Sequence, residues 1–394
     1  MHEAAMESVP YYEEPPSYDH FLQNHLLPNR PALIGPALTK DWRARKEWVE
    51  PTNANGAHTP AMQPRLDYLR EQFGEAKVTV ADCQERDFND QKRVDMKFEE
   101  FVDMFSSGRY YLKDWHMVKA FPNYHAYKVP DIFADDWMNE YWPTREDKDD
   151  YQFVYIGGDS TFTPLHADVY RSYSWSSNIC GIKKWTLFPP GQEDLLKDRL
   201  NNFAYDIRSI DESQFPNFEK ARRIVLYQRD GETLFVPSGW FHQVENIGST
   251  ISINHNWSNA CNLEATFQSL SSDLEDVRRS IDDVREEMSP MEFVGRCQWL
   301  LLLHSGWDWS ILLELLLCVS RRLGQQKDWV FQPDPTWQVQ QIRKVIDTLR
   351  ENEGEALTTY LEEKNLGSCI DDIEQELVKA ILHGSCNNNK AAST

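Results

Sequence analysis

A histidine–any residue–aspartate pair and one distant histidine constrain how these 394 residues can fold. His166 and Asp168 are two positions apart, and on a β-strand such residues point to the same face. His242 follows 76 residues after His166. Two imidazoles and one carboxylate are the protein ligands of non-haem Fe(II) sites, which leave three coordination positions open. If all three side chains bind one metal, a distant strand must return beside the first, as in a closed or sandwiched sheet.

The segments around these residues have the patterns of strands. Residues 157–161 form a glycine-containing loop that leads into the strand carrying His166. Residues 234–237 are an apolar run that stops at a Pro-Ser-Gly turn, and residues 251–254 alternate between apolar and polar. Between the two histidines, residues 180–190 read as a third strand that ends at two prolines. These patterns predict a core made mainly of β-strands.

Lys183 is the next candidate for chemistry. Strand alternation sends only one of the neighbours Lys183 and Lys184 inward, and alternation alone does not say which one. A lysine inside a barrel needs a counter-charge, because an isolated buried ammonium group is costly. A dicarboxylate cosubstrate would provide it, and Thr163 offers a hydroxyl to the same carboxylate. The alternative is that both lysines are solvated.

Over roughly residues 20–260 the chain resembles the JmjC-domain family of Fe(II)- and 2-oxoglutarate-dependent oxygenases. The motifs that carry the resemblance are residues 163–168, 181–190, 231–232 and 236–242. The resemblance implies an α+β fold with a mainly β core: a double-stranded β-helix, which is a cupin-like jelly roll. N-terminal α/β elements and a C-terminal helical region would accompany this core.

The resemblance also implies a role for each site residue. His166, Asp168 and His242 would bind iron. Lys183 and Thr163 would hold the distal carboxylate of 2-oxoglutarate. Relatives carry an asparagine after a tryptophan where this chain has Ser176 after Trp175. The other residues expected to face the cosubstrate are Tyr111, Asn254, Asn256 and Asn178, the last as a replacement for that asparagine.

One position separates subclasses of the family. The carboxylate ligand is Asp168, and His-x-Asp is typical of protein hydroxylases, whereas His-x-Glu is typical of histone demethylases. Residues 166–185 and 235–257 look most similar to a subgroup that hydroxylates a lysine of the eukaryotic translation termination (release) factor. The resemblance thus implies a protein lysyl hydroxylase that uses O2 and converts 2-oxoglutarate to succinate. The alternatives are a JmjC lysine demethylase and a non-catalytic, cupin-like binding module.

Charge and cysteine content narrow the partners and the compartment. The formal net charge of −22 argues against direct nucleic-acid binding, because phosphate contacts need a basic face. The seven cysteines include no Cys-x-x-Cys pair, so zinc fingers of chromatin-reader type are not expected. Their odd number in a long chain favours a reducing compartment. Because the N-terminus lacks signal-peptide features, we expect a cytoplasmic protein, with nuclear presence left open.

The apolar stretch at residues 299–320 is interrupted by His304, Asp308 and Glu314, which predicts buried helices and no membrane span. We expect a flexible N-terminus (1–17), an oxygenase domain (18–260, with core strands at about 108–260), a helical region (261–383) and a disordered tail (384–394). Within the helical region, apolar residues recur at spacings of four and three from Leu263 to Met288. This seam predicts either packing inside the region or a homodimer through the C-terminal helices.

Overall fold

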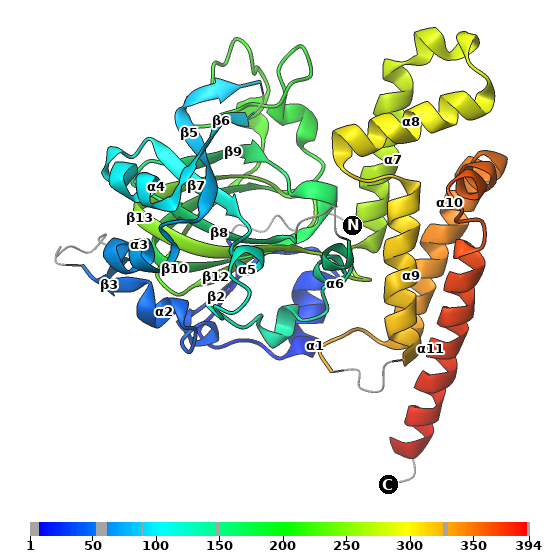
Figure 1. Cartoon of the computed structure of the whole chain (residues 1–394), viewed down its shortest axis with the longest axis horizontal. Helices are drawn as coiled ribbons and strands as arrows, with labels where there is room; N and C mark the ends of the chain where they lie inside the picture. Colours follow the sequence, from blue (N-terminus) through cyan, green and yellow to red (C-terminus); the bar gives the residue numbers. More distant parts are fainter. Residues whose placement is uncertain (1–7, 53–60, 89, 146–149, 326–329, 392–394) are drawn as a thin grey trace. The chain divides into compact units, whose positions relative to one another are not determined.

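The computed structural model describes residues 8–52, 61–88, 90–145, 150–325 and 330–391, and it divides into two compact units (Figure 1). The first unit comprises Met1–Asp131 and Asp147–Trp257, and the second comprises Ile132–Glu146 and Ser258–Thr394. The sequence placed residues 132–146 in the oxygenase domain. They belong to the second unit because their contacts are there: the Trp137 amide donates to the Ser258 carbonyl (2.8 Å), and Arg322 pairs with Asp135 (3.1 Å).

Two long antiparallel strands, β10 (Tyr173–Phe188) and β13 (Phe241–Trp257), form the centre of the first unit. Each long strand has different neighbours along its two halves. The first half of β10 pairs with β12 (Thr233–Val236) and its second half with β11 (Ile224–Gln228). Likewise, β13 pairs first with β9 (Phe162–His166) and then with β8 (Gln152–Gly157). The two halves are therefore two sheets that share their central strands.

The corner between these sheets lies at Gly181 in β10. The β10–β13 register shifts between Asn178, Cys180 and Ile182, which marks a bulge. Gly181 has φ +86°, and a Cβ at this position would lie 2.4 Å from the Ser249 carbonyl oxygen of the facing strand. Only glycine combines this backbone conformation with so close an approach. The bend allows one strand to serve both sheets, which is how a double-stranded β-helix closes around a site.

Additional strands widen the main sheet, whose order is β1-β2-β12-β10-β13-β8-β7-β5-β6. Their bounds are β1 (Tyr11–Tyr12), β2 (Ala32–Ile34), β5 (Lys77–Asp87), β6 (Asp90–Lys97) and β7 (Tyr110–Trp115). A separate pair consists of β3 (Val49–Pro51) and β4 (Met62–Pro64). The fold class predicted from the sequence, a cupin-like mainly β core accompanied by helices, is confirmed.

Part of the segment predicted to be a flexible N-terminus is ordered. Strand β1 pairs in parallel with β2, and the Tyr12 hydroxyl lies 2.8 Å from Nε2 of the buried His25. These contacts explain the difference from the expectation, which rested on composition. Residues 1–7 of the predicted flexible segment lie outside the described residues.

Short helices pack around the sheet of the first unit. They are α1 (Tyr18–Phe21), α2 (Ala44–Glu47), α3 (Leu66–Phe73), α4 (Phe98–Met104) and α5 (Met117–Ala120). Aromatic side chains hold α3 and α4 against β7, since the Phe73 and Phe98 rings both contact Trp115 with centroids 5.7 and 5.3 Å apart. This packing covers the outer face of β7 and leaves its other face toward the interior.

The second unit is helical. Its helices are α6 (Trp137–Tyr141), α7 (Leu263–Ser280), α8 (Pro290–Ser305), α9 (Trp309–Gln325), α10 (Pro335–Glu363) and α11 (Cys369–Ala391). Figure 1 shows α9, α10 and α11 side by side. Among the described residues, no single helix is long and apolar enough to cross a membrane; the pair α8 and α9, bent by 70°, meets the criteria of length and composition together.

The apolar seam of α7 is buried inside this unit from Leu263 to Val277, where α7 packs against α8 and α10. The sequence allowed this seam to pack either inside the region or between two subunits, and in the structure it packs inside the region. The helix ends at Ser280, and a 3₁₀ segment (Asp282–Glu287) follows, so the predicted continuation of the helix to Met288 is wrong. In a helix continued to Met288, Glu286 and Glu287 would lie in the last turn, at the negative end of the helix dipole, which disfavours continuation.

The predicted disordered tail is also partly wrong, because α11 continues through Ala391. No proline interrupts residues 384–391, and a helix anchored upstream extends by one hydrogen bond per added residue. The anchor consists of Ile373, Leu377 and Ala380, which are buried on one side of α11. Residues 392–394 of the predicted tail lie outside the described residues.

Candidate metal and cosubstrate site

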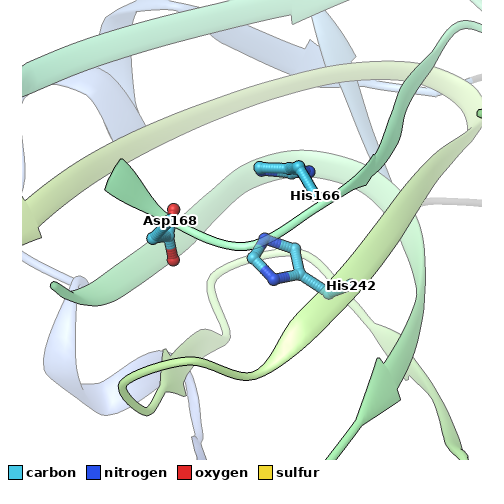
Figure 2. A group of neighbouring side chains, drawn as sticks. All are labelled: His166, Asp168 and His242. Atoms are coloured by element: carbon cyan, nitrogen blue, oxygen red, sulfur yellow. The ribbon is translucent and has the colours of Figure 1, made fainter. Parts of the chain in front are cut away.

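The pairing of β9 with β13 brings His166, Asp168 and His242 together (Figure 2). His166 ends β9 and lies opposite His242, the second residue of β13. Asp168 follows in the loop after β9. One potential ligand atom from each of the three side chains lies within 4.8 Å of the others, and Figure 2 shows the three side chains converging. The local cause is the pleat, which points His166 and Asp168 to the same side.

The hydrogen bonds of the two histidines leave one nitrogen of each available to a metal. Nδ1 of His166 donates to the Pro164 carbonyl (2.8 Å), and Nδ1 of His242 donates to the Trp240 carbonyl (2.9 Å). A carbonyl oxygen only accepts, so Nδ1 carries the proton and Nε2 keeps its lone pair. Burial, reinforced by the neighbouring His242, lowers the pKa of His166 to about 4. The neutral imidazole that a metal requires is therefore the form present near neutral pH.

Asp168 is oriented by a hydrogen bond from strand β10. The Ser174 hydroxyl donates to Asp168 Oδ2 at 2.7 Å, and the other carboxylate oxygen remains for a ligand. A hydrogen bond to the oxygen that does not bind the metal fixes the direction of a metal-binding carboxylate. Two neutral imidazole nitrogens and one carboxylate oxygen fit Fe(II) and its facial coordination.

Lys183 faces the interior, where Tyr111 meets it. Its ammonium donates to the Tyr111 hydroxyl at 3.0 Å, and its side chain is only 1% exposed. Burial lowers the pKa of Lys183 to about 7. The neighbour Lys184 points to the opposite face, where it pairs with Glu245 (2.9 Å). The sequence left open which of the two lysines points inward, and the structure shows that it is Lys183.

Polar groups around Lys183 suit the distal carboxylate of 2-oxoglutarate. Burial raises the pKa of Tyr111. Hydrogen bonds with Asn246 and Thr163 lower it by less, so the hydroxyl keeps its proton and can donate it in a hydrogen bond. Among the described residues, the buried Oδ1 of Asn246 has no hydrogen-bond partner. No carboxylate of the described residues lies at hydrogen-bond distance from the Lys183 ammonium, and a buried cation beside neutral donors fits an anionic ligand. The Tyr111 hydroxyl thus joins Lys183 and Thr163, and the role of these three residues toward 2-oxoglutarate stays a prediction.

Asn246 was missed by the sequence analysis. It lies directly opposite Lys183 in the β10–β13 register, and its amide nitrogen donates to the Thr161 hydroxyl (2.9 Å). Strand alternation could have found it. Side chains an even number of positions apart on a strand point to the same face, and Asn246 is four positions after His242, which is expected to point inward.

The remaining asparagines have different surroundings. Asn254 and Asn256 lie opposite Ser176 and Ser174 across the β10–β13 pair. The Ser176 hydroxyl donates to Asn254 (2.8 Å), and Asn256 donates to the Ser172 hydroxyl (3.1 Å). These residues form a polar row that reaches Asp168 through Ser174. The structure places Asn178 at the β10 corner, where its amide nitrogen donates to the Gly181 carbonyl (2.7 Å), so that nitrogen is engaged by the turn.

Comparisons with known proteins cover most of the chain. A family model described as a cupin-like domain matches residues 18–263. The 2-oxoglutarate and iron-dependent oxygenase JMJD4 of Danio rerio is 41% identical over 326 residues, which cover 79% of this chain and 74% of that protein. The human protein of the same name is 37% identical, with 78% of this chain and 74% of that protein covered. The arginine-specific demethylase JMJ20 of Arabidopsis thaliana is 43% identical, and the match covers 77% of this chain and 68% of that protein.

Proposed function

Because the chain belongs to the cupin-like JmjC family of 2-oxoglutarate- and iron-dependent oxygenases, we propose that it is a protein lysyl hydroxylase whose substrate is the translation termination factor. Iron and 2-oxoglutarate are the cofactor and cosubstrate of this family. The observation that carries the proposal is the convergence of His166, Asp168 and His242 in the same sheet pair as the buried Lys183.

One group of residues would bind the metal and another would bind the cosubstrate. His166, His242 and Asp168 would hold iron through two nitrogens and one oxygen, and Lys183, with Tyr111 and Thr163, would hold the distal carboxylate of 2-oxoglutarate. When bound, these groups supply the oxidising chemistry, in which O2 and 2-oxoglutarate yield succinate, CO2 and one oxygen atom for a substrate C–H bond. The polar row of β10 and β13 would keep Asp168 in place through the hydroxyl of Ser174.

We propose hydroxylation and not demethylation because the carboxylate ligand is Asp168. Asp168 stands where histone demethylases of this family typically carry glutamate. Arginine demethylation is the second candidate, because a relative named as an arginine-specific demethylase is 43% identical to this chain. The lysine demethylase and the non-catalytic module remain alternatives to be tested in the same assay.

One assay separates these possibilities. The purified full chain is incubated with Fe(II), 2-oxoglutarate, ascorbate and, in turn, the termination factor, a methyl-arginine peptide and a methyl-lysine peptide. A mass increase of one oxygen atom on the termination factor supports hydroxylation. Release of formaldehyde from a methylated peptide contradicts it and supports demethylation. Neither product, together with no Fe(II) binding, supports the binding module. His166→Ala should abolish the oxygen addition, and His304→Ala, an exposed histidine on α8, is the matched control.

The proposal extends to partners and location. A basic segment of a protein substrate suits a chain with a net charge of −22. We propose action in the cytoplasm, where the termination factor works, without direct binding of nucleic acid. Cross-linking followed by mass spectrometry in cells would identify a partner outside translation if this assignment is wrong.

A further inference from the structure

Strand β8 presents a row of aromatic side chains toward the site. Tyr151 directly precedes β8, and Phe153 and Tyr155 follow at alternate positions, so the three lie on the same face. All three are partly exposed, whereas Val154 and Ile156 on the opposite face are buried. Ring centroids are 6.3 Å apart both between Tyr151 and Phe153 and between Phe153 and Tyr155. We call Tyr151, Phe153 and Tyr155 the aromatic row.

The inner end of the aromatic row lies beside the catalytic groups. The ammonium of Lys183 is 5.6 Å from the centre of the Tyr155 ring. Burial raises the pKa of Tyr155, and Asp114 and Asp168 add to this effect, so its hydroxyl remains protonated beside both carboxylates. That hydroxyl donates to Asp114 at 2.6 Å, and Arg93 pairs with the same carboxylate at 2.8 Å. Tyr155 is therefore fixed next to the position where the metal and cosubstrate would bind.

The outer end is completed by Tyr170 and by a histidine–aspartate pair. The Tyr151 hydroxyl donates to the Tyr170 hydroxyl at 2.9 Å, and their ring centroids are 5.9 Å apart. The His116 ring lies 5.2 Å from Phe153, and its Nδ1 is 2.8 Å from a carboxylate oxygen of the buried Asp150. A carboxylate thus lies near each end of the row.

The backbone that places Tyr170 is strained. Tyr170 and Arg171 have φ values of +56° and +48°, and they follow Asp168 after one intervening residue, Val169. Each residue other than glycine in this region costs on the order of 1 kcal/mol, and such strain gathers at ligand-binding segments. Here it lets one loop provide both Asp168 to the site and the Tyr170 ring to the outer end of the aromatic row.

We infer that the aromatic row, with Tyr170, is the groove that takes the target side chain of the substrate, and that it selects a long side chain with a cationic end. Neighbouring rings of the row lie 6.3 Å apart, which is close to the reach of an extended lysine or arginine side chain, so such a side chain would contact two adjacent rings at once. Aromatic faces bind the cation, and they also cover the aliphatic stem. Asp114 and Asp150 add negative charge near the two ends, although Arg93 and His116 partner them.

This inference deepens the proposed function and rests on it, because the groove leads to the oxygenase site. Its test uses the full chain loaded with Fe(II) and 2-oxoglutarate under argon. The probes are the Nα-acetyl methylamides of lysine, arginine and norleucine, which share a stem and differ in terminal charge. Their binding is measured by saturation-transfer NMR. We expect the two cationic probes to bind about three- to thirtyfold more tightly than the norleucine probe.

Phe153→Leu tests the groove itself, because it removes an aromatic face and keeps an apolar side chain of similar size. It should remove most of the preference for cations. Phe88→Leu is the matched control, since Phe88 is 90% exposed at the tip of the β5–β6 hairpin. Tyr151→Phe keeps the ring and should retain the preference. Equal binding of all three probes to the unaltered protein overturns the inference, and so does a preference that Phe153→Leu leaves unchanged.

A second readout separates this inference from the proposed function. Succinate formation in air, without a protein substrate, reports the oxygenase alone. Succinate formation together with equal probe binding overturns the cationic groove and leaves the oxygenase standing. Selective probe binding that depends on Phe153, without succinate formation, supports the groove and contradicts the proposed enzyme. An unchanged thermal midpoint in circular dichroism shows that Phe153→Leu folds, independently of any activity.

Discussion

His242 lies directly opposite His166 across the β9–β13 pair, with ring centroids 4.3 Å apart and the ring planes at 56°. Both rings donate through Nδ1 to a backbone carbonyl two residues earlier in the chain. The two strands therefore fix both tautomers before a metal arrives. This pre-organisation means that the backbone, and not only the three side chains, defines the site.

The first prediction concerns iron binding. His242→Ala should weaken Fe(II) binding by more than about 100-fold, because even the loss of a group that only hydrogen-bonds to a metal ligand costs about 10- to 100-fold. Calorimetric titration of Fe(II) under argon measures the effect. His304→Ala should bind as the unaltered protein does. Equal Fe(II) affinity in His242→Ala would contradict the assignment of the metal site.

The second prediction uses the two adjacent lysines. Lys183→Met removes the inward charge and should weaken 2-oxoglutarate binding by about 10- to 100-fold, as loss of a charged hydrogen bond does. The same change should raise the thermal midpoint of the ligand-free protein, because it removes a buried ammonium. Lys184→Met, on the outer face, should leave binding unchanged. Equal weakening in both variants would show that the pocket is elsewhere.

The third prediction is a pH dependence. Burial lowers the pKa of Lys183 to about 7 from its ordinary value of 10.5, so between these values the unfolded chain binds the proton and the folded chain does not. The unfolding free energy of the ligand-free protein should therefore rise with pH across this window. Affinity for 2-oxoglutarate should fall over the same range, by up to about tenfold per pH unit, because binding requires the protonated lysine. Titrations from pH 6 to 9 measure this slope, which Lys183→Met should lose.

The fourth prediction tests the corner of β10. Gly181→Ala should destabilise the fold by about 2–4 kcal/mol, because it combines a positive φ with a contact of 2.4 Å to the Ser249 oxygen. Gly191→Ala has a similar φ of +85° but no atom within 4 Å of the added Cβ, so it should cost only about 1 kcal/mol. Urea denaturation compares the two. Similar losses would show that the close approach at Gly181 is readily relieved.

The homodimer through the C-terminal helices stays a prediction. Because the seam of α7 is buried within its unit, a dimer would need another face, such as that of α8 with Trp299 (53% exposed) and Leu303 (70% exposed). These residues are four positions apart and share a face. Sedimentation should then give a dimer that Leu303→Asp converts to a monomer, whereas Leu200→Asp, in the first unit, does not. A monomer at all concentrations of the unaltered protein would contradict the prediction.

The parts of this molecule that the sequence predicted well are those set by local spacing. The His166–Asp168 pair depends on the two-residue pleat, and the apolar seam of α7 shows its helical period directly. The features that residue spacing could not predict are those set by contacts between residues far apart in the sequence. The inward choice of Lys183 over Lys184 required the register with β13, and the role of Asn246 follows from the same register. Residues 132–146 join the second unit through Arg322 and Ser258, far along the chain.

The position of Lys183 has a consequence for the protein between turnovers. Its ammonium has a hydroxyl neighbour and, among the described side chains, no ion-pair partner, so this position favours a small dianion. Succinate, the product, keeps the same distal carboxylate as 2-oxoglutarate. If Lys183 holds 2-oxoglutarate as proposed, the two compete for one lysine, and the ratio of these metabolites, more than the amount of either, would set how much of the protein is ready for another cycle.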